Sequence, residues 1–100
     1  EFIALNGGPH FKFNEAISLA VHCNTQEEVD YYWEKLTADG GQESQCGWLK
    51  DKYGLSWQIV PDVLLNQWTT SDPAKAQRVM QAMMGMKKII IKDIEAAAAG

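Results

Sequence analysis

Hydrophobic and polar residues alternate along two segments of the chain, residues 16–23 and 55–60. Because side chains of a strand repeat every two residues, both segments are predicted to be strands with one apolar face. In AISLAVHC the apolar face consists of Ile17, Leu19, Val21 and Cys23. The opposite face carries small or polar residues: Ala16, Ser18, Ala20 and His22. In LSWQIV the apolar face consists of Leu55, Trp57 and Ile59, and the opposite face carries Ser56, Gln58 and Val60. Gln58 therefore lies mid-strand either on a solvated sheet face or facing a pocket.

A helix is predicted after residue 24, where the period of the apolar pattern changes. Thr25 and Glu28 have the spacing of a capping box, in which each side chain satisfies a free backbone N–H at the start of a helix. Apolar residues then follow at i, i+3, i+4 and i+7, which predicts one buried stripe: Val29, Tyr32, Trp33 and Leu36. Gly40 and Gly41 end the helix.

Shorter elements complete the first half of the chain. Phe2 to Leu5 are predicted to form an apolar strand that ends in the loop 6–9. Residues 43–50 read as a less regular strand, in which Gly47 indicates a bulge or a close backbone approach. The turn at 51–54 then returns the chain antiparallel, so that Trp57 is expected to pack on Trp33 and Leu36.

The last third of the chain is predicted to be helical. VLLNQW (63–68) forms a short turn, and Asp72 with Pro73 marks a second helix start. The apolar stripe of this second helix is expected to comprise Ala76, Val79, Met80 and Met83. Ile89 to Ile91 form a short apolar piece, and Asp93 caps a final helix over 94–99. The order of elements predicts an α+β fold, with an antiparallel or mixed sheet that carries helices on one face.

Composition narrows the class of protein. One hundred residues make a single small domain. The net charge is −4 and the nine basic residues are scattered apart from Lys87 and Lys88, which argues against nucleic-acid binding. No apolar run approaches the roughly 20 residues that span a bilayer, and no signal peptide is visible. Cys23 and Cys46 fit either one disulfide or two free thiols, and we favour buried free thiols in a cytoplasmic protein.

Three stretches of the chain carry a family resemblance: FIALNGGPHFKFNEAISLAVHC, TQEEVDYYWEKLTADGG and CGWLKDKYGLSWQIVP. Together they resemble the PhnB-like, or 3-demethylubiquinone-9 3-methyltransferase-like, branch of the glyoxalase/bleomycin-resistance (vicinal oxygen chelate) superfamily, over residues 1–95. The resemblance implies a βαβββ module with a C-terminal helical tail. Such a module is half of a cupped sheet, which holds a small ligand and, in metal-dependent relatives, a divalent ion.

Residues 1–100 correspond to one such module, the C-terminal one, and residues 1–8 resemble the closing strand of a preceding module. We expect the chain to be a fragment. The other half of the cup is expected to come from a missing N-terminal module or from a second copy of the chain. A half-cup would expose an apolar face, so a homodimer is predicted.

The resemblance also places the candidate site. Gln58 stands where metal-dependent relatives carry a carboxylate ligand, and the other strand begins with Asn14, Glu15 and Ala16 rather than a His. A neutral amide is a poor ligand for hard or borderline divalent ions, so no metal and no cofactor are expected. The residues expected to contact a small-molecule ligand are Gln58, Ser18, His22, His10 and Trp48.

Each of these candidates also has a purely structural interpretation. His10, beside two glycines, reaches a pocket mouth or is an exposed loop imidazole, and the second interpretation is favoured. His22 reads more readily as a structural histidine that faces the concave side. Trp48 lines the cup if Gly47 bulges the strand.

Two functions follow, in different classes. The first is a small-molecule-binding protein whose cup encloses an apolar or weakly polar ligand. The alternative is a metal-dependent isomerase, lyase or dioxygenase, with ligands supplied by the missing half. A structural half-domain without a site is a third, simpler interpretation. Methyl transfer from S-adenosylmethionine is not expected, because the chain lacks the glycine-rich turn in a βαβ setting and is too short for a doubly wound sheet.

Overall fold

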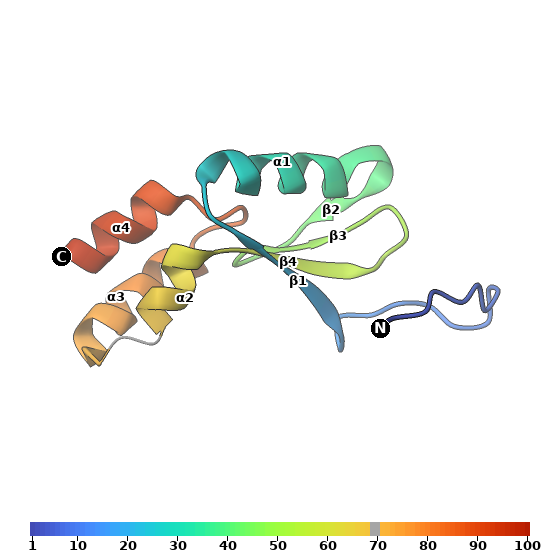
Figure 1. Cartoon of the computed structure of the whole chain (residues 1–100), viewed down its shortest axis with the longest axis horizontal. Helices are drawn as coiled ribbons and strands as arrows, with labels where there is room; N and C mark the ends of the chain where they lie inside the picture. The colour runs from blue at the N-terminus through green and yellow to red at the C-terminus, as the bar shows by residue number, and fades with distance from the viewer. Residues whose placement is uncertain (69–70) are drawn as a thin grey trace.

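The computed structural model describes residues 1–68 and 71–100, and its first half is a βαβββ unit (Figure 1). The elements are β1 (Ser18–Cys23), α1 (Gln26–Thr37), the short 3-10 helix η1 (Ala38–Gly40), β2 (Gln42–Glu43), β3 (Trp48–Lys50) and β4 (Ser56–Pro61). The strands form one sheet in the order β1-β4-β3-β2. β1 runs parallel to β4, while β4, β3 and β2 are antiparallel neighbours. The predicted α+β fold with a mixed sheet is confirmed.

The start of α1 follows the predicted capping box. The Thr25 Oγ1 accepts a hydrogen bond of 3.2 Å from the Glu28 backbone N–H, and the Glu28 carboxylate accepts one of 3.0 Å from the Asn24 backbone N–H. Both bonds satisfy donors that a helix start leaves unpaired. Helix α1 itself ends at Thr37, with an extended Ala38 as its C-cap, three residues before the predicted glycine end. Gly40, with φ of 107°, ends the following η1 instead.

One face of the sheet packs against α1. The buried side chains of this contact come from β1, α1, β3 and β4: Cys23, Val29, Trp33, Leu49 and Ile59. Leu36 and Trp57 pack at its margin, as the alternation in β4 predicted. Tyr32 was expected in the buried stripe and is 36% exposed instead, because its position on the helix lies at the border of this contact.

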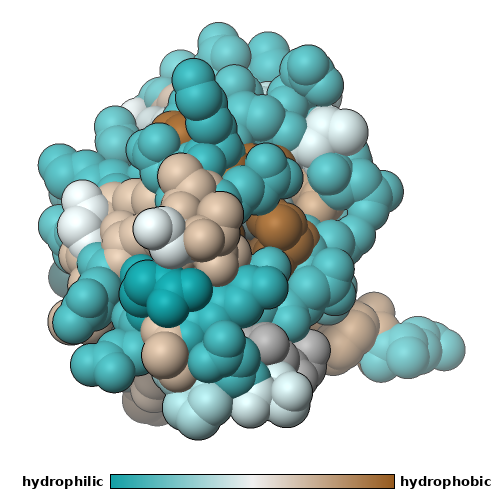
Figure 2. All heavy atoms as spheres, turned by 90° about the vertical axis from the view of Figure 1, so that its left-hand side faces the viewer, coloured by the Kyte–Doolittle hydropathy of each residue, from teal (hydrophilic) through white to brown (hydrophobic). Residues whose placement is uncertain are grey.

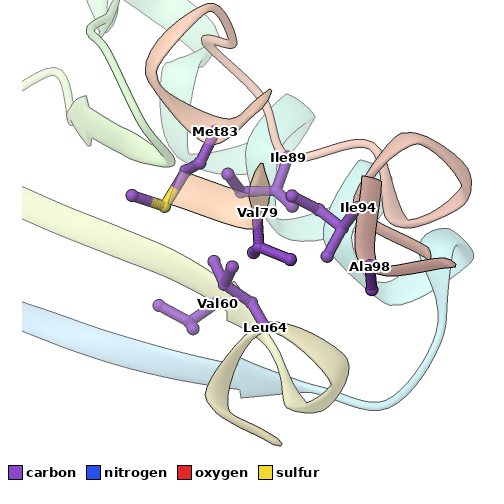
Figure 3. Close-up of a cluster of buried hydrophobic side chains, with 7 residues drawn as sticks. All are labelled: Val60, Leu64, Val79, Met83, Ile89, Ile94 and Ala98. Carbon is purple, nitrogen blue, oxygen red and sulfur yellow. The ribbon is translucent and has the colours of Figure 1, made fainter. Parts of the chain in front are cut away.

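Three helices follow the sheet: α2 (Asp62–Trp68), α3 (Pro73–Met84) and α4 (Ile91–Ala99). They enclose a second apolar cluster with β4, drawn in Figure 3: Val60, Leu64, Val79, Met83, Ile89, Ile94 and Ala98. Asp72 caps α3 as predicted, since its carboxylate accepts from the backbone N–H groups of Ala74 and Lys75. Met80 was expected in the α3 stripe and is 41% exposed instead, because the helix presents Val79 and Met83 to the cluster.

The prediction that Asp93 caps the last helix is wrong. Helix α4 begins at Ile91, and the Asp93 N–H already bonds to the Ile90 carbonyl within its first turn. The cap comes from far away in the sequence. The Gln26 side chain accepts a bond of 2.7 Å from the Ile91 N–H and donates one of 3.1 Å to the Ile89 carbonyl.

Gly47 fixes the tail to the sheet at a second place. The backbone N–H groups of Cys46 and Gly47 donate 2.8 Å bonds to the carbonyls of Met86 and Lys87. Gly47 has φ of 84°, and a Cβ there would lie 3.1 Å from the Ile89 side chain. The close backbone approach predicted at Gly47 is therefore confirmed.

Two predicted strand boundaries are wrong. Phe2 to Leu5 are not a strand: residues 1–17 contain no strand or helix and all are exposed. A strand needs a partner for its backbone groups, and none of the described residues pairs with this segment. The expected strand 43–50 is interrupted at residues 44–47, because Cys46 and Gly47 both have positive φ.

The remaining features concern the cysteines and the surface. Cys23 and Cys46 are both free thiols, Cys23 buried and Cys46 half-buried, so the disulfide alternative is excluded. Among the described residues, no helix has both the length and the apolar character to cross a bilayer. Seen from the end where the C-terminal helices lie, the surface is mainly hydrophilic, with apolar side chains gathered in small areas (Figure 2).

Candidate functional site

The cross-strand register assembles one sheet face from residues of β1, β3 and β4. Ala20, Gln58 and Trp48 stand opposite one another in one row, and Ser18, Ser56 and Lys50 in the next. His22 is paired with Val60 at the end of β1. Leu49 and Trp57, which alternate with these residues, point to α1, so the rows lie on the opposite face. We call this surface the open sheet face: Ser18, Ala20, His22, Trp48, Lys50, Ser56 and Gln58.

Among the described residues, no helix lies over the open sheet face, since α1 covers the other side and the C-terminal helices lie beyond one end (Figure 1). Ala20 and His22 are exposed, and Ser18, Trp48 and Gln58 are half-buried. Small side chains on β1 and a large ring on β3 lie on either side of β4. The surface is therefore most accessible along β1 and is bordered by an indole on β3.

Gln58 makes one hydrogen bond on this face. Its Nε2 donates to the Ser18 Oγ over 2.8 Å. This bond holds the side-chain amide across the sheet toward β1 and leaves its carbonyl oxygen without a donor among the described residues. An oriented amide oxygen beside an indole ring is able to accept a hydrogen bond from a weakly polar guest.

A polar row crosses the sheet beside Gln58. The Lys50 ammonium group forms an ion pair with the Glu15 carboxylate, and this hydrogen bond is the main reason why the pKa of Glu15 lies below its usual value. Between Lys50 and Ser18 lies Ser56, which is buried, with an Oγ that has no hydrogen-bond partner among the described residues. The row supplies one paired cation and two hydroxyl groups.

The structure brings together four of the five predicted site residues. Gln58, Ser18 and Trp48 lie side by side, and His22 lies on the same face two residues beyond Ala20. His10 does not join them: it is exposed in the irregular segment 1–17 and makes no hydrogen bond or ion pair with a described residue. Because no strand or helix holds that segment on the sheet, the loop interpretation of His10 agrees with its position.

Lys50 also lies on the open sheet face, which the sequence pattern did not predict. In the strand expected over 43–50, alternation could not assign residues to a face of the sheet, because the strand is interrupted at Gly47. The register Lys50↔Ser56 shows its face directly. Once β3 is known to begin at Trp48, the alternation of β3 assigns Trp48 and Lys50 to one face and Leu49 to the other.

The donor set of the open sheet face is mostly neutral. Across residues 1–68 and 71–100 there is no group of three or more His, Cys, Asp or Glu side chains placed to hold a metal ion. Gln58, Ser18 and Ser56 offer an amide and two hydroxyls, to which His22 adds one imidazole. Hard divalent ions bind such a set far more weakly than a set of carboxylates.

Fold and site together define a βαβββ module with one covered and one open sheet face. The family described as 3-demethylubiquinone-9 3-methyltransferase matches residues 1–60, which is more than half of the chain. The chain belongs to this family.

A solved structure is also similar. It is described as a putative 3-demethylubiquinone-9 3-methyltransferase, PhnB protein, from Bacillus cereus. The two share 39% sequence identity with a TM-score of 0.49, over 54% of this chain and 49% of that one. The matched region therefore spans about half the length of that protein. Among curated proteins, none matches the chain.

Proposed function

We propose that the chain binds a small, apolar or weakly polar molecule on the open sheet face, within a cup that a second module or a second copy completes. The observation that carries this proposal is the Gln58–Ser18 pair, an oriented polar group on an uncovered sheet face. Ligand sites combine mostly apolar walls with a few placed polar groups, and the Trp48 ring and the Ala20 methyl group supply such walls.

Methyl transfer from S-adenosylmethionine is not part of the proposal. That cofactor's common fold is a doubly wound parallel sheet with a glycine-rich turn. Here β1 and β4 are the parallel pair, and the remaining pairings are antiparallel. The family's description therefore supports kinship, while the sheet supports a binding cup.

The second candidate is a metal-dependent isomerase, lyase or dioxygenase. The observation that favours it is the exposed His22 on the open sheet face, one imidazole to which a completing half could add further ligands. Metal analysis of the purified assembled protein separates the two candidates. Stoichiometric zinc, nickel, iron or manganese would favour the enzyme.

The binding proposal is tested with benzamide as the probe, because its ring suits the Trp48 indole and its amide suits Gln58. Backbone NMR shifts on titration are expected to change at Gln58, Ser18 and Trp48. Ala20→Trp should abolish these changes by filling the face. The matched control is Ala74→Trp, at an exposed position on α3, which should leave them intact. Shifts confined to the α1 side, or binding that survives Ala20→Trp, would contradict the proposal.

Gln58→Glu tests the same position by its charge. Replacing the amide with a carboxylate should raise the affinity of the assembled protein for Mn²⁺ or Zn²⁺, because carboxylates are the stronger ligands. Calorimetric titration with the metal alone measures this. Unchanged affinity would mean that residue 58 does not face the cup.

A further inference from the structure

Lys50 on β3 and Glu15 before β1 form an ion pair that crosses the open sheet face. β4 lies between β1 and β3, and Ser56 of β4 stands opposite both Ser18 and Lys50. Neighbouring strands lie about 4.8 Å apart, so Glu15, three residues before Ser18, reaches Lys50 across the width of β4. The ion pair therefore bridges the sheet at the level of Ser56.

Ser56 carries a buried hydroxyl group at the same position. The residue is 1% exposed, and its Oγ has no hydrogen-bond partner among the described residues. A buried hydroxyl without a partner costs free energy, and such groups are rare in folded proteins. Neither Glu15 nor Lys50 bonds to it, although their ion pair spans the strand that carries it. An unused hydrogen-bond donor thus lies one strand away from an ammonium group.

The Glu15 carboxylate is weakly held on Lys50. Its side chain is 61% exposed, and exposed ion pairs contribute little to stability. Glu15 belongs to residues 1–17, which contain no strand or helix (Figure 1). An open crevice of about 390 Å³ is lined by Leu55 and by residues of the segment 12–17. The carboxylate is therefore free to leave Lys50 without disturbing either apolar cluster.

We propose that Lys50 and Ser56 form a carboxylate subsite of the ligand site, which Glu15 occupies until a carboxylate of the ligand replaces it. The Lys50 ammonium group pairs with one oxygen of the ligand, and the Ser56 hydroxyl donates to the other. Glu15 does not serve both groups because its backbone precedes β1 and limits its reach, whereas a ligand has no such tether. This rests on the proposed function for the apolar body of the ligand and goes beyond it by giving that body one charged end.

The neighbouring row of the open sheet face suits the body of such a ligand. Trp48 and Gln58 lie two residues from Lys50 and Ser56 along the same strands. Positions two apart on a strand are separated by roughly 7 Å, which is comparable to the length of a benzoate ion. A ring that packs on the Trp48 indole therefore places its carboxylate at Lys50.

Benzoate tests the subsite, with benzamide as its neutral counterpart of the same shape. In the full chain Glu15→Gln frees Lys50, so benzoate should bind roughly tenfold tighter than to the parent, because hydrogen bonds between charged groups are the stronger ones. Benzamide affinity should stay the same. NMR titration measures both affinities, and benzoate should shift the amide signals of Lys50 and Ser56. The double variant Glu15→Gln, Lys50→Met should lack the gain.

The matched control is Asp30→Asn, which frees Lys88 away from the open sheet face. The Lys88 side chain is 33% exposed, close to the 35% of Lys50, and it pairs with Asp30 over 2.8 Å. Both variants remove one negative charge, so the general attraction of an anion changes equally. Asp30→Asn should therefore leave benzoate affinity at the parental value.

The Ser56 hydroxyl is tested separately, in the Glu15→Gln chain. Ser56→Ala should weaken benzoate binding, because one of the two hydrogen bonds to the carboxylate is lost. It should not lower the free energy of unfolding in urea, since the hydroxyl has no partner among the described residues of the free protein. Weaker binding without loss of stability separates a ligand contact from a structural role.

Three results would overturn the subsite: no gain in Glu15→Gln, a gain that survives Lys50→Met or appears in Asp30→Asn, or benzoate binding that ignores Ser56→Ala. Benzamide separates these results from the proposed function. Benzamide binding at Gln58 without a benzoate gain contradicts the subsite alone. A benzoate gain that depends on Lys50, without any benzamide binding, contradicts the proposed function alone.

Discussion

The two faces of one sheet differ in almost every property that burial controls. On the covered face, Leu49 and Ile59 are fully buried against Val29 of α1. On the open sheet face, the neighbouring positions hold an alanine, a half-buried amide and an exposed imidazole. The covered face contributes stability, because its central side chains, such as Leu49 and Ile59, are removed from water. The open sheet face leaves Ala20 and His22 exposed and Gln58 half-buried, and it lacks the stability that a covering element would add.

This difference shows that adjacent residues of one strand have separate roles, because they lie on opposite faces of the sheet. Ile59 and Gln58 are consecutive, yet the first closes the core and the second orients a hydrogen bond toward β1. Because strand parity separates them, a substitution at one need not disturb the other. The comparison between the faces can be broken or sharpened by three measurements.

The largest effect is expected from Ile59→Ala. Removing a fully buried branched side chain should lower the free energy of unfolding by about 2–5 kcal/mol, through lost burial and the cavity left behind. Gln58→Ala should cost only about 0.5–1.5 kcal/mol, the net contribution of one hydrogen bond. Urea denaturation of the two variants measures both. Equal losses would mean that the open sheet face is packed as tightly as the covered one.

An intermediate effect is expected from Cys23 on the covered face. Burial, helped by the charges of Glu28 and Asp62, raises the pKa of the Cys23 thiol above its ordinary 9.0. Above pH 9.0 the unfolded chain releases this proton while the folded chain retains it, so stability should fall as pH rises past that point. Cys23→Ala should flatten this decline in urea midpoints against pH. A decline of the same slope in the variant would assign it to another group.

The smallest effect is expected from the ion pair on the open sheet face. The hydrogen bond from Lys50 lowers the pKa of Glu15 below 4.5, and Lys88 chiefly lowers that of Asp30 below 3.8. Both carboxylates therefore add stability at higher pH that is lost as pH falls through their folded pKa values. Lys50→Met should remove the Glu15 part of the acid decline and Lys88→Met the Asp30 part. Because Glu15 is exposed, the Lys50→Met change should be slight, and a large one would show that the pair is shielded from water.

Sequence patterns predicted the local elements and, for β1 and β4, which residues lie on each face of the sheet. The capping box of Thr25 and Glu28 located α1, and alternation placed Gln58 and Trp57 on opposite faces. Those signals depend on residues close together in the sequence, so they hold whatever the rest of the fold is. The strand expected at Phe2 to Leu5 failed because strand formation depends on a partner that a local pattern does not contain.

For the candidate site, too, the sequence predicts the face on which a residue lies but not its contacts across the sheet. Ser18, His22 and Gln58 were assigned to one face, but only the register between strands shows that Gln58 reaches Ser18, whose positions are 40 residues apart. The face of Lys50 could not be predicted, because the positive φ values of Cys46 and Gly47 interrupt the strand before it. The wrong cap at Asp93 has a similar origin, since the group that receives the Ile91 N–H is the distant Gln26.

The Gln26 amide joins two parts of the fold that are synthesised at different times. It belongs to the first turn of α1, yet both of its partners on the tail, Ile89 and Ile91, leave the ribosome more than 60 residues later. Ile91 also packs at the margin of the cluster under α1. Before α4 is synthesised, Gln26 has its helix neighbour Asp30 as a hydrogen-bond partner, and its two bonds to the tail form only afterwards.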